Sequence, residues 1–174
     1  MAKSVQGVSD TGAEVGHYVL DIHGPECACG LKGCFEVYCG GAALAKRMQT
    51  EISEQKINTQ VLSEAGGDIT KIDAVCLIAA LKKKDPYAQK IWDEFVERLA
   101  QGIGIILMAF NPQAVILGTI AIKAGLLLFE PLKKQLPRFA WKEPIEACRI
   151  EASQLGEKIS ELSALALAKQ ALLQ

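Results

Sequence analysis

The sequence has 174 residues, of which 50% are hydrophobic and 22% are charged, and its formal net charge is −1. This composition fits an ordinary globular protein with one sizeable core. No stripe of basic residues occurs, so nothing indicates binding to nucleic acid or to an anionic membrane surface. The most apolar stretch, residues 103–110, is too short to span a bilayer.

The first twelve residues, MAKSVQGVSDTG, contain one Lys and no apolar run, so we do not expect a secretory signal peptide. The six cysteines are therefore expected in a reducing compartment. Closely spaced cysteines there indicate a metal site or a reactive thiol rather than disulfides. We expect the protein in the cytoplasm.

The N-terminal third is expected to combine loops with a strand and a helix. Residues 1–13 are small and polar and predict a loop. Residues 14–22 are rich in β-branched and apolar side chains and predict a strand. A Gly- and Cys-rich loop over residues 24–34 follows, and the helical pattern then covers residues 34–55.

The middle of the chain is expected to be helical after a loop at residues 56–69. Thr70 is the predicted N-cap of a helix that ends at residues 82–84 and carries an apolar face of Val75, Ile78 and Leu81. Pro86 is expected in the first turn of a long helix that Asn111-Pro112 ends. Its apolar face repeats at intervals of four residues, with Ile91, Phe95, Leu99 and Ile103.

The C-terminal third predicts alternating strands and helices. Residues 114–117 and 145–152 are the expected strands, and residues 120–134 and 158–173 are the expected helices. Strands that alternate with helices indicate an α/β domain.

The residues 27–34 are the most informative segment. They contain three thiols, those of Cys27, Cys29 and Cys34. Gly30 and Gly33 allow the backbone to fold tightly enough for the thiols to converge. Since a structural zinc ion takes four ligands at about 2.0–2.3 Å, this pattern predicts a zinc site with a fourth ligand from elsewhere.

The fourth ligand is expected to be one of the two histidines, His17 or His23, and spacing does not choose between them. The thiols have two other interpretations. Free, incidental thiols are disfavoured because Cys and Gly alternate so densely. A disulfide is weaker still, because adjacent Cys-X-Cys residues bridge each other only with strain.

A family resemblance rests on this segment. Glu14-Val15-Gly16-His17, followed by the cysteine loop and Phe35-Glu36-Val37-Tyr38-Cys39-Gly40, resembles the signature of ROK proteins (repressors, open reading frames and sugar kinases). Asp85-Pro86, Asn111-Pro112 and Val115-Ile116-Leu117-Gly118 follow that family's order. The resemblance covers nearly the whole chain.

The resemblance implies an actin-like ATPase (ribonuclease-H-like) fold of two lobes. Residues 1–174 would form the C-terminal lobe, with a zinc- and sugar-binding loop at 14–40 and a helical, nucleotide-side part at 41–174. The family's phosphate loop of the Asp-X-Gly-X-Thr kind and its aspartate base have no counterpart here. The N-terminal lobe would therefore be absent, and the chain alone is expected to be an inactive fragment.

The resemblance also assigns site residues. His17 corresponds to the zinc-ligating histidine, so the ligands would be His17, Cys27, Cys29 and Cys34, and His23 would be a surface turn residue. Glu14, His17 and Glu36 match positions that hold sugar hydroxyls. Gly118 is carried over as a nucleotide contact, although Thr119 follows where the family more often has further glycines, and its Cβ limits close approach.

The implied function is an ATP-dependent, glucokinase-like hexose kinase that uses Zn²⁺ structurally and, in the full-length parent, ATP and Mg²⁺. Its expected partners are a hexose, the N-terminal lobe and further copies of itself. A sugar-responsive ROK repressor with a nucleic-acid-binding segment is the alternative, disfavoured by Tyr38-Cys39-Gly40. A zinc-stabilised module without a ligand is the third hypothesis. The sequence does not choose among hexoses.

Overall fold

The computed structural model describes residues 7–9 and 11–171. Its helices and strands, in chain order, are α1 (Phe35–Cys39), α2 (Gly41–Gln55), α3 (Gln60–Glu64), α4 (Ala74–Lys82), α5 (Pro86–Phe110), β1 (Ala114–Leu117), α6 (Thr119–Ala124), α7 (Leu126–Gln135), α8 (Lys142–Ala147), β2 (Arg149–Ala152) and α9 (Ile159–Ala171). Four short 3-10 turns complete the secondary structure of the described residues: η1 (Val15–His17), η2 (Ile69–Lys71), η3 (Leu136–Arg138) and η4 (Gly156–Lys158).

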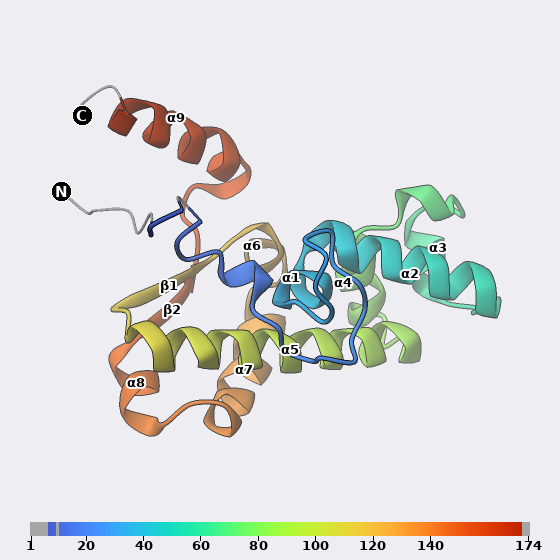
Figure 1. The fold of residues 1–174 in the computed structure, drawn as a ribbon. Coiled ribbons are helices and arrows are strands. Elements are labelled where there is room, and N and C mark those ends of the chain that lie inside the picture. The colour runs from blue at the N-terminus through green and yellow to red at the C-terminus, as the bar shows by residue number, and fades with distance from the viewer. Residues whose placement is uncertain (1–6, 10, 172–174) are drawn as a thin grey trace.

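Helix α5 is the central element, with α1 and α4 packed on one side and α7 and α8 on the other (Figure 1). The predicted apolar face is confirmed, since Ile91, Phe95, Leu99 and Ile103 are all buried, at 7% exposure or less. Full burial of such a side chain stabilises the fold by about 1.5–3 kcal/mol. The predicted ends of this helix are confirmed as well, because Pro86 lies in the first turn and Asn111 is a left-handed C-cap.

Two glycines let neighbouring segments approach α5 closely. A Cβ at Gly102 would lie 2.5 Å from the ring of Phe35 in α1, and a Cβ at Gly104 would lie 2.6 Å from Cβ of Phe139. Both distances are shorter than real carbon contacts, so a side chain at either position would displace its neighbour. The missing side chain at Gly102 therefore leaves room for Phe35, and this contact allows α1 to pack closely on α5.

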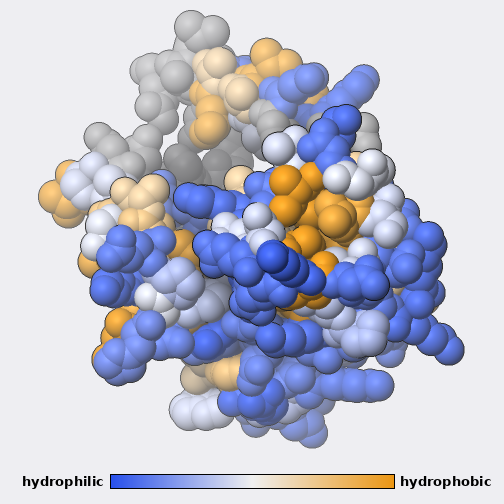
Figure 2. Space-filling model, turned by 90° about the vertical axis from the view of Figure 1, so that its right-hand side faces the viewer, coloured by the Kyte–Doolittle hydropathy of each residue, from blue (hydrophilic) through white to orange (hydrophobic). Residues whose placement is uncertain are grey.

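The sheet of the described residues has two parallel strands, β1 and β2, paired from Ala114 with Arg149 to Leu117 with Ala152. Helices α6, α7 and α8 form the connection between them. Parallel strands joined through helices confirm the α/β prediction. The surface drawn in Figure 2 is mainly hydrophilic, with its broadest apolar area right of centre and smaller ones at the top and left. None of the helices within the described ranges is both long and apolar enough to cross a membrane.

The predicted strand at residues 14–22 is wrong. This segment begins with η1, in which the N–H of His17 donates to the carbonyl of Glu14, and it then pairs with the cysteine loop only through a bridge between Val19 and Cys34. Of its β-branched residues, Val15 lies in η1 and Ile22 in a turn, and only Val19 takes part in the bridge.

The cap predicted at Thr70 is also wrong. Asp73 caps α4, its carboxylate accepting from the N–H groups of Val75 and Cys76, whereas Thr70 lies in η2 with its N–H bonded to Asp68. The start of α4 is consequently shifted, and Val75 is 52% exposed rather than part of the core face.

Several other boundaries differ from the prediction. The predicted helix at 34–55 divides at Gly40 into α1 and α2, and the one at 120–134 divides at Gly125, whose φ of 53° ends α6. Helix α3 forms inside the predicted loop 56–69, and the first part of the predicted strand 145–152 belongs to α8. Residues 172–173 of the last predicted helix, and 1–6 and 10 of the first predicted loop, lie outside the described residues.

The start of α5 yields a stability prediction. The buried carboxylate of Asp85 accepts from the N–H of Ala88 at 2.8 Å, the hydroxyl of Thr59 at 2.8 Å and the N–H of Gln60 at 2.9 Å. Burial alone would raise the pKa of Asp85, but these hydrogen bonds outweigh burial and hold the pKa below its ordinary value. Asp85→Ala should therefore lower the free energy of unfolding by about 3 kcal/mol near neutral pH.

The pH dependence of this loss has a defined sign. Because the folded-state pKa is depressed, the stabilisation is present above the unfolded-state pKa of about 3.9 and disappears as the pH falls through the folded-state value. Chemical denaturation at several pH values measures this. Asp73→Ala is the matched control, since Asp73 caps α4 from an exposed position. A loss for Asp85→Ala no larger than that for Asp73→Ala would contradict the account.

Candidate metal centre and ligand pocket

The cysteine loop is a tight hairpin held by its own backbone. The N–H of Cys27 donates to the carbonyl of Leu31 at 2.8 Å, and the N–H of Gly30 donates back to Cys27 at 3.0 Å. The N–H of Gly33 donates to Pro25 at 2.7 Å. Gly33 adopts a φ of 64°, and a Cβ there would lie 1.7 Å from the carbonyl oxygen of Asp21, so only glycine fits.

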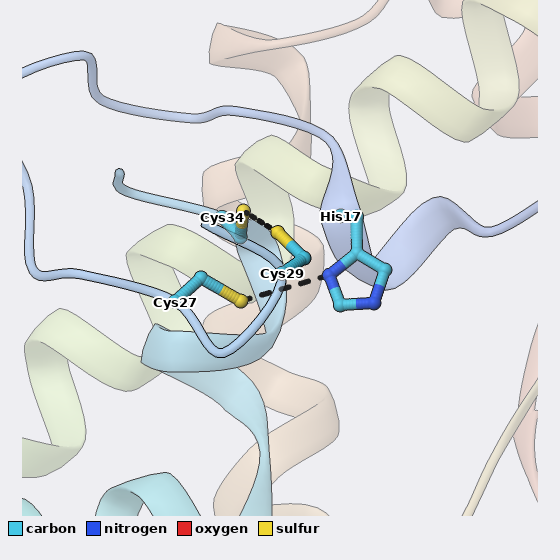
Figure 3. A group of neighbouring side chains, drawn as sticks. All are labelled: His17, Cys27, Cys29 and Cys34. Atoms are coloured by element: carbon cyan, nitrogen blue, oxygen red, sulfur yellow. Dashed lines mark hydrogen bonds between the residues drawn. The ribbon is translucent and has the colours of Figure 1, made fainter. Parts of the chain in front are cut away.

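This backbone turns three thiols toward one imidazole (Figure 3). The ligand atoms of His17, Cys27, Cys29 and Cys34 all lie within 4.8 Å of one another. Sγ of Cys27 lies 3.6 Å from Nδ1 of His17, and Sγ of Cys29 lies 3.6 Å from Sγ of Cys34. The other ring nitrogen of His17 points away from the thiols.

The donor set fits a tetrahedral zinc ion. Two thiolates at about 2.3 Å from one metal ion are separated by about 3.8 Å, and a thiolate and an imidazole nitrogen by about 3.5 Å. The two 3.6 Å separations are close to those values. Burial raises the pKa of Cys34 to about 12, so this sulfur needs a cation beside it to become a thiolate.

The structure distinguishes the two histidines that the sequence left open. His17 reaches the thiols from η1, whereas His23 is an exposed turn residue whose backbone N–H donates to Asp21. Asp21 and Asp68 occupy turns, and Cys76 and Cys148 are buried small side chains. Cys39 is only half-buried, and its thiol donates to the carbonyl of Phe95.

A pocket of about 420 Å³ adjoins the four-residue cluster. Glu14, His17, Glu36 and Gly118, the residues expected to contact a sugar or a nucleotide, all line it. Oε2 of Glu36 lies 3.8 Å from Nδ1 of His17. The structure thus brings one histidine into contact with both the thiol cluster and the pocket.

Most of the pocket wall was not predicted from the sequence. The further lining residues are largely apolar or small, and they include Phe35, Cys39, Phe95, Leu99, Thr119, Ile120 and Leu128, which come from α1, α5, α6 and α7. Phe95 and Leu99 belong to the apolar repeat of α5, so their spacing indicated only the core. The presence of Gly40 and Gly41 between α1 and α2 was the available signal, because small residues leave space beside a site.

Comparisons with known proteins identify the family of the chain. The family model described as "ROK family" matches residues 2–171. The chain is 30% identical over 164 residues to a glucokinase of Thermotoga maritima, covering 94% of this chain and 51% of the relative. It is 28% identical over 157 residues to a xylose repressor of Bacillus spizizenii, covering 90% of this chain and 36% of the relative.

A solved structure of a ROK family glucokinase from Streptomyces griseus, in complex with glucose and AMPPNP, superposes with a TM-score of 0.73. The two sequences are 27% identical, and the match covers 90% of this chain and 51% of that one. The chain spans about half the length of the glucokinases that it matches. The family match over nearly all residues, together with these relatives, shows that the chain belongs to the ROK family.

Proposed function

We propose that this chain is the zinc-bearing, sugar-recognising C-terminal lobe of an ATP-dependent, glucokinase-like hexose kinase. The observation that carries the proposal is the convergence of four metal-ligand atoms beside a pocket that Glu14, His17 and Glu36 line. The similarity to glucokinases, one of them solved with glucose and AMPPNP, supports it.

The four residues would hold zinc through Nδ1 of His17 and the sulfurs of Cys27, Cys29 and Cys34. Bound zinc would supply structural order, because it cross-links the η1 segment to the cysteine loop. The second ring nitrogen of His17 then carries a proton that can donate to a ligand oxygen. Glu36 follows Cys34 by two residues, so the same cross-link fixes the backbone of Glu36.

The composition of the pocket suits a neutral sugar. Carboxylates such as Glu14 and Glu36 accept hydrogen bonds from hydroxyl groups. The apolar side chains of Phe35 and Leu99 provide a surface for the C–H faces of a sugar ring. Polar acceptors on one side and apolar carbon on the other are what recognition of a hexose requires.

The nucleotide site is proposed only for the full-length parent. Gly118 is exposed in the same pocket, and nothing lies within 4 Å of the position where its Cβ would be. The other lobe would supply the phosphate loop, the contacts to ATP and Mg²⁺, and the aspartate that accepts the proton of the sugar hydroxyl. The present chain alone would then have no kinase activity.

The proposed partners follow from the same division of the protein. They are a hexose, the N-terminal lobe and further copies of the protein, which we place in the cytoplasm. Helix α9 stands apart from the body of the molecule, with three exposed leucines, Leu162, Leu165 and Leu167. Such an apolar surface supports a contact with the other lobe or with a second copy.

A sugar-responsive repressor is the alternative, favoured by the similarity to xylose repressors. In that case the pocket would bind the sugar as an effector. The segment that precedes this chain in its parent protein distinguishes the two functions. A phosphate loop and a catalytic aspartate there support a kinase, whereas a helix-turn-helix supports a repressor and contradicts the proposal.

The metal centre yields the first prediction of this section. Protein purified without added zinc should contain one zinc ion per chain, because the four ligand atoms are already close together. Cys29→Ser should lose the metal, while the matched control Cys76→Ala, at a buried cysteine outside the cluster, should retain it. Elemental analysis measures the stoichiometry. Near-zero zinc, together with a thermal stability that a chelator does not change, would refute the site.

Two glycines of the loop give a second prediction. Gly33→Ala should abolish zinc binding, because its Cβ collides with the carbonyl oxygen of Asp21. Gly30→Ala should retain zinc, since nothing lies within 4 Å of its Cβ position, and its left-handed backbone should cost only about 1–2 kcal/mol. Zinc titration of both variants provides the comparison. Equal zinc affinity in the two variants would contradict this account of the loop.

Glu36 gives the third prediction. In the full-length parent, Glu36→Gln should weaken hexose binding about ten- to hundredfold, because a lost hydrogen bond to a charged group costs about 1.5–3 kcal/mol. Zinc content should not change. The control is Glu26→Gln, which removes an exposed carboxylate of the nearby cysteine loop that does not line the pocket. Calorimetric titration with a panel of hexoses measures both, and affinities unchanged for every hexose would remove Glu36 from the site.

A further inference from the structure

Arg98 of α5 reaches across to the segment that precedes the cysteine loop. Its guanidinium donates to Oδ2 of Asp21 at 3.2 Å and lies 4.6 Å from the centre of the Tyr38 ring. Arg98 itself neither lines the pocket nor belongs to the ligand cluster. The contact is half-buried, with 25% of the Arg98 side chain and 32% of the Asp21 side chain exposed.

Gln101, one helical turn further along α5, makes a second hydrogen-bonded contact with this segment. Its side-chain amide donates to the carbonyl of Leu20 at 3.1 Å, and its own oxygen accepts from Arg98 at 3.1 Å. Asp21 in turn accepts from the backbone N–H of His23 at 3.0 Å. We call Arg98, Gln101 and Asp21 the α5 clamp.

Through Arg98, the α5 clamp joins both ends of the cysteine loop to one helix. Asp21 lies before the first thiol, whereas Tyr38 lies after the last thiol and two residues after Glu36. Leu20, which Gln101 holds, follows His17 by three residues. The segments that carry the histidine, the thiols and the pocket carboxylate are therefore all attached to the same part of α5.

Hydrogen bonds within the loop and its flanking residues do not attach it to α5. Leu20 and Asp21 donate their N–H groups to the carbonyl of Gly33, and Gly33 donates to Pro25. These bonds hold the loop closed against residues 20 and 21, but none of the bonded residues belongs to α5. Among the described residues, the polar bonds from residues 20–24 to α5 come from Arg98 and Gln101.

We propose that Arg98 is a positioning residue for the metal centre, acting through Asp21 and Tyr38 to place the three thiols and Glu36 relative to His17. The inference rests on the proposed zinc site. A planar guanidinium can bond a carboxylate and lie over an aromatic ring at once, which an ammonium group does less well. The geometry of the clamp thus requires Arg rather than merely a positive charge.

The test is zinc affinity, measured on the present chain by competition with a chromogenic chelator. Arg98→Met should weaken zinc binding about tenfold, the lower end of the roughly ten- to hundredfold range found when groups that orient metal ligands are removed. Arg98→Lys should lie between Arg98→Met and the wild type. In the zinc-bound protein, hydrogen exchange at residues 20–24 should be faster in Arg98→Met.

The matched control is Arg47→Met. Arg47 is similarly half-buried and bonds Glu51 and Glu94, away from the loop, so its loss should lower stability but leave zinc affinity unchanged. Asp21→Asn removes the charge of the other partner in the same contact and should also weaken zinc binding. This variant provides the test if Arg98→Met does not fold. Wild-type zinc affinity and exchange in both Arg98→Met and Asp21→Asn would overturn the inference, as would an equal loss in Arg47→Met.

The same experiment separates this inference from the function on which it rests. A wild-type chain that binds no zinc overturns the metal centre and the clamp together. A wild-type chain that binds zinc, with variants at Arg98 that bind it equally well, leaves the metal centre standing and overturns only the clamp.

Discussion

The convergence of three thiols on an imidazole from a separate segment is the constraint on which the rest of the site depends. An eight-residue loop can bring Cys27, Cys29 and Cys34 together only if its backbone turns twice, and Gly33 makes the second turn possible. His17 must then arrive from η1, which lies before the loop in the chain. When His17 and the thiols lie together, Glu14 and Glu36, which precede and follow the ligand residues in the chain, line a common pocket.

Helix α5 serves the core and the site with the same residues. Phe95 and Leu99 are buried among the core side chains and also form part of the pocket wall. Gly102 admits the ring of Phe35, which sets the position of α1 and hence of Glu36. Because one rigid helix determines both, the pocket does not require a separate scaffold, and changes in packing along α5 reach the ligand site directly.

Some features could be predicted from the sequence, whereas the features set by contacts between distant segments could not. The convergence of the thiols in the cysteine loop and the ends of α5 at Pro86 and Asn111 are local features, and they were predicted correctly. Residues 14–22 have the composition of a strand, but within the part of the chain that the structure describes no strand lies beside them, and local turns form instead. Phe95 has the periodicity of a core residue, and periodicity alone does not tell a core from a pocket wall.

The central claim is that His17 and the three cysteines form one metal centre, and X-ray absorption at the zinc edge tests it most directly. The account predicts one nitrogen at about 2.0 Å and three sulfurs at about 2.3 Å around each zinc ion. In His17→Ala the nitrogen contribution should disappear while the three sulfurs remain. Four sulfur ligands or an oxygen-rich shell in the wild-type chain would contradict the account, because His17 would then not link the cysteine loop to the pocket.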